Sequence, residues 1–163
     1  MHRQYVVGLI SDTHGLLRPE ALDLLGGSDF IVHAGDVGDS EILATLARIA
    51  PVTAVRGNVD KGVWAQSLPE AEVLKVGEAA LLYVLHNIAE LNIDPAAAGV
   101  KVVVSGHSHK PGVRRKDGVV YVNPGSAGPR RFSLPLSVGR LFVDAGEVTV
   151  KIVEIEKTTR AEP

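Results

Sequence analysis

Short apolar runs alternate with polar turns along the first third of the chain, and their spacing predicts the elements. Residues 40–50 carry apolar side chains at helical spacing, so we expect a helix there that Ser40 caps and Pro51 stops. Residues 19–25 begin with proline and precede two glycines, which is typical of a short helix. A β-α-β-α-β order predicts a parallel sheet with right-handed crossovers. The predicted strands of this part are residues 5–11, 30–33 and 52–55.

The remaining apolar runs predict one further strand and three hairpins. The hairpins turn at residues 77–78, at Asp117-Gly118, which is a favoured tight-turn pair, and at residues 144–146. We therefore predict the α/β fold class, with two stacked sheets flanked by helices. Residues 1–163 should form a single domain, with a frayed tail at 157–163. The predicted strands are residues 72–76, 80–85, 101–105, 113–116, 119–122, 139–143 and 147–155, with a loop or short helix over 94–99.

The composition narrows the class of protein. The chain has 163 residues, 45% of them hydrophobic, which suits one folded domain and excludes a disordered chain. No apolar run reaches the roughly 20 residues of a membrane span, and the N-terminal segment does not match a signal peptide, so we expect a cytoplasmic protein. The formal charge of −2 argues against nucleic acid as a partner. Because the chain has no cysteine, any metal site must use nitrogen and oxygen ligands.

Five of the predicted strands run directly into side chains that can bind a metal ion. One of them leads through Gly106 into His107 and His109, two imidazoles that face the same side of an extended chain. Because the carboxyl ends of strands in an open α/β sheet converge on one crevice, we expect these side chains to meet. Seven ligands are too many for one ion and suit two ions that share a carboxylate. The predicted metal ligands are Asp12, His14, Asp36, Asn58, His86, His107 and His109.

Each of these residues also has an ordinary structural explanation. Asp12 and Asp36 could cap turns, Asn58 follows a glycine as turn residues often do, and His86 could be a hydrogen-bonded core histidine. It is less plausible that separate structural reasons place such a residue at the end of each of five strands than that all of them belong to one site. We therefore predict a dinuclear metal site. His33 lies inside its strand, and we expect it in the core.

The segments SDTHG, HAGDVGD, RGNVD, LHN and GHSH follow one another in this order between Leu9 and Arg131. They resemble the signature blocks of calcineurin-like metallophosphoesterases. The short chain and the segment NPGSAGPRR resemble the small bacterial and archaeal phosphodiesterase branch of that family. The resemblance implies a four-layer α/β/β/α sandwich of two mixed sheets.

The resemblance also implies how the ligands are shared. Asp36 would bridge the two ions and would, with Asn58 and His107, be central to catalysis. Such mixed ligands accept manganese, iron, cobalt, nickel or zinc, and the resemblance favours manganese. The first ion would be held by Asp12, His14, Asp36 and His109, and the second by Asp36, Asn58, His86 and His107.

This arrangement predicts a phosphoesterase, and more specifically a phosphodiesterase acting on a small phosphoester. Two ions about 3.5–4 Å apart hold a hydroxide at neutral pH, which would attack phosphorus in line. Val59 stands where many relatives have a histidine thought to assist the leaving group, which predicts a preference for aryl diesters over alkyl esters. Asn87 also departs from the family pattern after His86, so a contact behind the ligands would differ.

Five residues near the predicted site have two interpretations each. Asp60 would orient a ligand histidine or cap a turn, and Arg56 would reach substrate phosphate or lie on the surface. Residues Asn123, Gly125 and Ser126 would offer N–H groups to an anion or form a structural turn.

Two rival functions use the same fold. One is a non-catalytic protein-interaction scaffold, which the complete ligand set disfavours. The other is a phosphomonoesterase or nucleotide pyrophosphohydrolase with the same metals. Trp64, Leu68 and residues 88–93 would form either a contact in a homo-oligomer or part of the core.

Overall fold

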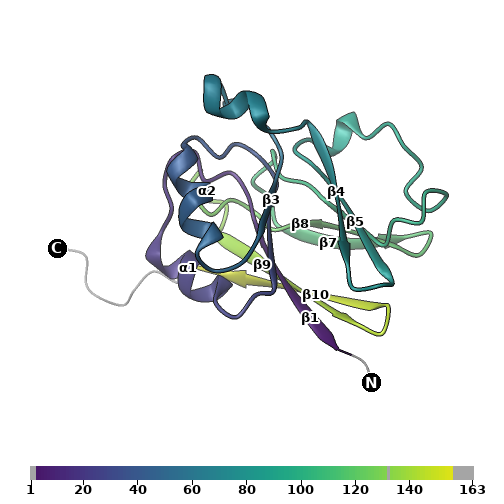
Figure 1. The fold of residues 1–163 in the computed structure, drawn as a ribbon. Helices are drawn as coiled ribbons and strands as arrows, with labels where there is room; N and C mark the ends of the chain where they lie inside the picture. The colour runs from purple at the N-terminus through teal and green to yellow at the C-terminus, as the bar shows by residue number, and fades with distance from the viewer. Residues whose placement is uncertain (1–2, 132, 156–163) are drawn as a thin grey trace.

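The structure, a computed structural model, describes residues 3–131 and 133–155. A first five-stranded sheet has the order β10-β9-β1-β2-β3 (Figure 1). Strands β1, β2 and β3 are parallel, and β9 and β10 add antiparallel strands at one side. The elements of this sheet are β1 (Gln4–Ile10), β2 (Phe30–His33), β3 (Val52–Ala54), β9 (Ser137–Asp144) and β10 (Glu147–Glu154), with the crossover helices α1 (Pro19–Leu25) and α2 (Ser40–Ala47).

A second five-stranded sheet has the order β4-β5-β6-β8-β7. Here β5, β6 and β8 are parallel, while β4 and β7 pair antiparallel at the two edges. The prediction of two mixed sheets is therefore confirmed. The elements of this sheet are β4 (Ala71–Val76), β5 (Ala80–Leu85), β6 (Val102–Val104), β7 (Gly112–Lys116) and β8 (Val119–Asn123).

The two sheets pack face to face through alternate, mostly β-branched side chains. In β5, Leu82 and Val84 are fully buried toward the first sheet, where Val7 and Leu9 of β1 meet them in one cluster. Each such side chain contributes about 1.5–3 kcal/mol on burial, so this layer is the main source of cohesion between the sheets. The sequence alternation of β5 thus fixes which of its faces is internal.

The outer faces of the two sheets are covered unequally. Helices α1 and α2 bury Leu25 and Leu46 against the first sheet. The second sheet is covered by residues 86–100, which include the 3₁₀ turn η2 (Ile88–Glu90) and a turn at 95–99, with Leu91 and Ile93 packed on Val103. Among the described residues the predicted fourth layer is therefore a 3₁₀ turn with loops rather than an α-helix.

Several predicted boundaries are corrected by local hydrogen bonding. Helix α2 ends at Ala47 instead of Ala50, because Arg48 and Ile49 bond three residues back and tighten the last turn before Pro51. Its cap is Asp39 rather than Ser40, since the Asp39 carboxylate accepts the N–H of Glu41 at 3.0 Å.

A 3₁₀ helix that was not predicted, η1 (Val63–Ser67), places Trp64 and Leu68 against the helices of the first sheet. Core packing thus explains both side chains. Ile88 remains 37% exposed. The predicted frayed tail, 157–163, lies outside the described residues. Among the residues described, no helix is long and apolar enough to cross a membrane.

The parallel strands of both sheets end at the same place in the molecule. Backbone bonds join the loop after β1 to the loop after β2, from Asp12 N to Gly35 O at 3.0 Å. Another joins the segments after β5 and β6, from Gly106 N to His86 O at 2.9 Å. The side chains that follow these strands therefore face one another across the joint between the two sheets.

Candidate metal centre

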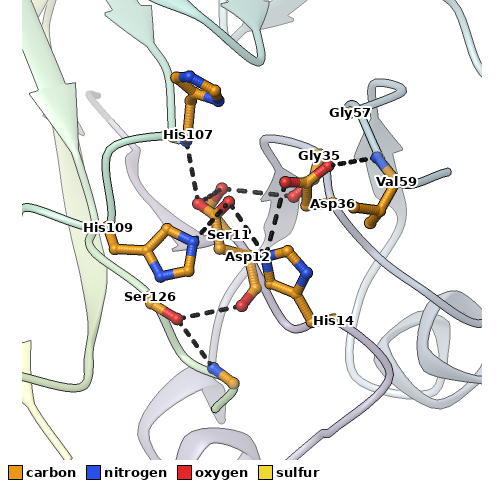
Figure 2. Close-up of polar contacts among 12 residues, drawn as sticks. Ser11, Asp12, His14, Gly35, Asp36, Gly57, Val59, His107, His109 and Ser126 are labelled. Atoms are coloured by element: carbon orange, nitrogen blue, oxygen red, sulfur yellow. Dashed lines mark hydrogen bonds and ion pairs between the residues drawn. The ribbon is translucent and has the colours of Figure 1, made fainter. Parts of the chain in front are cut away.

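Asp12 lies at the middle of the candidate site and is completely buried. One carboxylate oxygen, Oδ2, accepts the Ser11 hydroxyl at 2.7 Å and the backbone N–H of His107 at 3.1 Å (Figure 2). The first partner precedes it in the loop after β1, and the second lies in the loop after β6 of the other sheet. The carboxylate of Asp12 therefore ties the two sheets together at their carboxyl ends.

The other oxygen, Oδ1, faces three histidines. It lies 3.5 Å from His109 Nε2, 3.8 Å from His14 Nε2 and 3.9 Å from His86 Nε2. Asp36 Oδ2 lies 3.1 Å from His86 Nε2 and 3.5 Å from His14 Nε2. The donor atoms fall into two groups, each within 4.8 Å, that share Asp12: one with His14 and His109, the other with Asp36 and His86.

Four buried atoms of these side chains have no hydrogen-bond partner within the described part of the protein. Buried side-chain nitrogen and oxygen atoms are normally hydrogen-bonded, and each exception needs an explanation. Here four of the five buried atoms without a partner belong to predicted ligands: Asp12 Oδ1, His14 Nε2, His86 Nε2 and His109 Nδ1. Carboxylate and imidazole donors left without partners in one place fit divalent cations, which would satisfy them.

The orientation of the His86 ring also suits the binding of a metal ion. Its Nδ1 lies 2.7 Å from the carbonyl oxygen of Ala34, so that nitrogen carries the proton and donates it. The lone pair of Nε2 is then directed at Asp12 and Asp36. A metal-binding histidine commonly donates its second N–H to a carbonyl in this way, which fixes the tautomer.

The two carboxyl groups differ in acidity. Burial raises the pKa of the Asp12 carboxyl, although the Ser11 hydrogen bond and the nearby histidines oppose the rise. Burial also acts to raise the pKa of Asp36, but His86, the N–H of Val59 and His14 outweigh it and hold that pKa at about 2. Asp36 is therefore ionised at neutral pH and able to bind a cation.

The histidines divide in a similar way. Burial lowers the pKa of His86, but the carboxylate of Asp36, the carbonyl of Ala34 and Asp12 more than compensate and raise it overall. Burial lowers the pKa of His109, with Arg131 contributing. A proton on His86 and a metal ion therefore compete for the same nitrogen, since only neutral imidazole binds a metal.

The loops that carry the ligands adopt an unusual backbone conformation. Of the seven non-glycine residues with positive φ in the described part of the chain, five are predicted ligands. A left-handed conformation costs roughly 1–2 kcal/mol for a residue with a Cβ atom, so such residues mark places where the fold imposes the geometry. Their φ angles are 56° at Asp12, 46° at His14, 56° at Asp36, 71° at His107 and 63° at His109.

Glycines next to the ligands make the close approach of the loops feasible. A Cβ atom on Gly57 would lie 2.2 Å from both the backbone N and Oδ1 of Asp36. A Cβ atom on Gly106 would lie 2.0 Å from Ser11 Oγ and 2.6 Å from Asp12 Oδ2. Gly57 and Gly106 therefore each give space to a carboxylate from another loop, and Gly35, which precedes Asp36, gives space to the ring of His86.

His33 is a core histidine, as predicted, and it also holds two ligand loops together. Its Nδ1 accepts the N–H of Gly35 at 3.1 Å, so its proton must be on Nε2, which lies 3.0 Å from the Thr13 hydroxyl. That hydroxyl donates in turn to the carbonyl of Val37 at 2.8 Å. Burial lowers the pKa of His33 to about 4, which keeps this neutral form at physiological pH. The sequence offered no signal for the part that Thr13 plays.

Two predicted ligands, Asn58 and His107, lie at the rim of the site. Both are exposed, and neither belongs to the two carboxylate–histidine groups. The ring of His107 packs edge-on to His86, with 5.3 Å between centroids, and Figure 2 shows it turned away from Asp12. Asn58 lines an open cavity together with His86. Their ligand roles stay predictions.

Asp60 and Arg56 act on the backbone around the site. The Asp60 carboxylate accepts the N–H groups of Gly57 at 2.8 Å, Gly38 at 2.9 Å and Val37 at 3.2 Å, so it caps the loops rather than orienting a ligand histidine. The Arg56 guanidinium donates to the carbonyl of Leu68 at 3.1 Å and pairs with Glu70 at 3.2 Å.

The segment from Asn123 to Ser126 forms a turn that its own side chains hold, and a role toward an anion stays a prediction. The N–H of Gly125 is taken by the Asn123 side-chain oxygen at 2.9 Å, and the Asn123 amide donates to Gly106 O. The Ser126 hydroxyl donates to the carbonyl of Asp12 at 3.1 Å and lies 3.3 Å from Gly128 N (Figure 2). These bonds brace the loops that carry Asp12 and His107.

Comparisons with known proteins agree with this geometry. The family model described as the calcineurin-like phosphoesterase superfamily domain matches residues 6–146. The chain is 34% identical to a probable metallophosphoesterase of Methanothermobacter thermautotrophicus over 158 residues, covering 91% of each protein. It is 33% identical to a probable metallophosphoesterase of Methanocaldococcus jannaschii over 164 residues, covering 93% of this chain and 82% of the relative.

Solved structures share the fold. Vacuolar protein sorting 29 from Cryptosporidium parvum is similar with a TM-score of 0.75 and 22% identity, covering 94% of this chain and 99% of that one. A structure described as a novel archaeal phosphodiesterase is similar with a TM-score of 0.71 and 19% identity, covering 91% and 99%. At these identities the likeness concerns the fold.

We expect Gly106→Ala to damage the candidate site through steric conflict with Ser11 and Asp12. The added Cβ atom should lower the free energy of unfolding by about 1–3 kcal/mol and weaken the binding of Mn²⁺. Urea denaturation and calorimetric titration with Mn²⁺ measure the two effects. Gly112→Ala is the matched control, since nothing lies within 4 Å of its Cβ position. Equal behaviour of the two variants would contradict the close-approach argument.

We expect His33 to make stability depend on pH below neutrality. The unfolded chain takes up a proton near the ordinary histidine pKa of 6.5, whereas the folded protein resists protonation of His33 down to about pH 4. The free energy of unfolding should therefore fall as the pH is lowered from 6.5 to 4, by roughly 3 kcal/mol from this residue. Urea denaturation with a chelator present, compared between the protein and His33→Gln, measures this contribution. Parallel pH profiles for the two proteins would refute it.

Proposed function

The chain belongs to the calcineurin-like phosphoesterase superfamily, and from this membership we propose that it is a dinuclear metal-dependent phosphodiesterase. The observation that carries the proposal is the set of four buried donor atoms, on one aspartate and three histidines, that lack hydrogen-bond partners in the described structure. Two overlapping groups that share Asp12 suit two cations better than one.

The proposed division of the ligands follows the observed separations. Asp12, His14 and His109 would hold one cation, and Asp12, Asp36 and His86 the other. Asn58 and His107, at the rim, would complete the second group. Asp12 therefore shares the bridging function that the family resemblance assigned to Asp36, because its Oδ1 faces histidines of both groups.

Divalent cations in such a site supply Lewis-acid stabilisation of the phosphoryl oxygens and lower the pKa of water, with manganese proposed as the natural ion. The protein supplies a fixed and largely buried ring of donors, because hydrogen bonds between loops hold the left-handed conformations of Asp12 and Asp36. Such donors need no rearrangement during the reaction, which is the condition for strong electrostatic stabilisation of a phosphoryl transition state.

Water is the proposed nucleophile, since the serines near the site are unsuited to attack. The Ser11 hydroxyl donates to Asp12 and is buried. The Ser108 oxygen accepts the N–H of Lys110 and the Asn123 amide. Neither hydroxyl has a histidine placed to remove its proton, so direct attack on phosphorus without a covalent enzyme intermediate is the simpler route.

Phosphodiesters are the proposed substrates on two grounds. The archaeal structure with the same fold is described as a phosphodiesterase. The Arg56 guanidinium beside the site is engaged by Glu70 and Leu68, which leaves it less available for the second negative charge of a monoester.

We expect the protein to hydrolyse bis(p-nitrophenyl) phosphate when Mn²⁺ is added, and to lose this activity with EDTA. Asp36→Ala removes a ligand of the second group and should lower kcat by at least 100-fold. Release of nitrophenolate measures the rate. Comparison with p-nitrophenyl phosphate and with a nucleotide anhydride tests the rival specificities for monoesters and pyrophosphates.

The outcomes of this assay separate the candidate functions. Equal and negligible rates for the protein and Asp36→Ala would favour a non-catalytic scaffold. A faster reaction with the monoester or the anhydride would overturn the diesterase proposal while retaining a metal-dependent hydrolase.

We expect a steep dependence of the rate on the leaving group, because Val59 cannot donate a proton. Val59 is 47% exposed, and its N–H lies 3.0 Å from Asp36 Oδ1, so its side chain stands beside the site. Rates across a series of aryl and alkyl diesters should fall as the pKa of the leaving alcohol rises. Val59→His should flatten this dependence and accelerate the alkyl esters by about 10-fold or more. A flat profile for the unaltered protein would contradict the prediction.

A further inference from the structure

An open cavity of about 310 Å³ adjoins the candidate metal centre on the side of the second sheet. Asn58 and His86 are part of its lining, so a group that fills it touches the second proposed metal group. The volume is at the small end of the range for ligand pockets, which is enough for one sugar, ring or short chain. The remainder of its lining comes from Arg56, Gly57, Glu70, Ala71, Tyr83, Leu85, Glu90 and Asn92.

Of the charged side chains that line the cavity, Arg56 and Glu70 form an ion pair, whereas Glu90 has no partner among the described residues. The only cation in the lining, Arg56, pairs with Glu70 at 3.2 Å and donates to Leu68 O. The Glu90 carboxylate has no ion pair or hydrogen bond to any described residue, although its backbone N–H bonds to Asn87 O. Apart from the metal centre, the lining therefore offers one exposed carboxylate without a partner, Glu90, and no lysine or arginine that is free to pair with an anion.

The cavity also contains uncharged polar side chains, among them Tyr83 and Asn92. The Tyr83 side chain is partly buried on the outer face of β5, and its ring forms part of the wall. An aromatic ring beside a carboxylate attracts ammonium groups and accommodates hydroxylated carbon chains. The Asn92 side chain adds a donor and an acceptor to the lining.

We infer that this cavity holds one ester arm of the substrate and selects an arm that is uncharged or cationic and rich in hydrogen-bond donors. The inference rests on the proposed phosphodiesterase function and adds the substrate class to it. An arm with a further phosphate or carboxylate would face Glu90 with no free lysine or arginine beside it, which costs binding free energy. Glu90 and Tyr83 are thus determinants of specificity, and nucleotide anhydrides are poor substrates.

Three p-nitrophenyl phosphodiesters that differ only in the second arm test this inference. The arms are 2-aminoethyl, 2-methoxyethyl and carboxymethyl. None of them carries a free hydroxyl that could displace nitrophenolate intramolecularly, and all three diesters share one leaving group. We expect kcat/KM to decrease in that order. Glu90→Gln should reduce the ratio between the first and the last by about 3- to 10-fold, and Glu90→Lys should reverse the order. Glu78→Gln, an acidic residue in the β4–β5 hairpin beside Tyr5, should leave the ratio unchanged.

A binding measurement complements the kinetics and needs no turnover. The chain has three tyrosines, so the ring signals of Tyr83 are assignable by comparison with Tyr83→Phe. Titration with O-phosphoethanolamine in the presence of Mg²⁺ should shift these signals more than titration with 2-phosphoglycolate. Glu90→Gln should remove the difference.

The results distinguish this inference from the function on which it rests. The inference would be overturned if metal-dependent hydrolysis occurred but the kcat/KM ratios between the diesters did not change in the Glu90 variants, and the Tyr83 signals did not depend on the charge of the ligand. The diesterase proposal would then still stand. Absence of hydrolysis with every diester would overturn the diesterase and, with it, the assignment of the cavity to a substrate arm.

Discussion

The buried carboxylate of Asp12 is the interaction on which the architecture of the site depends. It lies at the end of a strand in one sheet, accepts an N–H from a loop of the other, and faces histidines that follow strands of both. An ionised group without solvent is unfavourable by several kcal/mol unless it is paired. Its second oxygen has no partner in the described structure, so a cation or a proton must satisfy it. A cation bound at this residue would therefore stabilise the folded chain.

The remaining ligands are held by contacts between loops rather than by regular structure. Left-handed backbone at Asp12, His14 and Asp36 is retained because N–H groups of one loop bond to carbonyls of the next, at 2.9–3.0 Å. Buried side chains with no direct role in chemistry complete the support, with Asp60 accepting three N–H groups and His33 linking two loops through Thr13. The strain is concentrated where the ligands are, which leaves their donor atoms fixed before any ion binds.

The sequence predicted well those features that depend on residues close together in the chain. Apolar alternation located the described strands, and the chemistry of the residues at their ends identified the carboxylates and histidines that meet at the centre. It could not predict that Asp60 reaches backbone groups more than 20 residues away, or that Asn123 supports the loop before His107, because such pairings depend on tertiary structure. The end of α2 was misjudged for a local reason, since 3₁₀ bonds and α bonds leave the same apolar pattern.

The thin cover of the second sheet connects the metal centre with the adjoining cavity. Residues 86–100 begin with a proposed ligand, His86, and continue through η2. They also supply Glu90 and Asn92 to the lining of the cavity. A long helix at this place would pack its whole side against the sheet, as α1 and α2 do on the other face, and would fill the space above Tyr83. A short 3₁₀ turn covers Val103 with only a few apolar side chains and leaves that space open. One segment thus both positions a ligand and shapes the neighbouring pocket, so changes in its length or composition alter specificity without rebuilding the sheets.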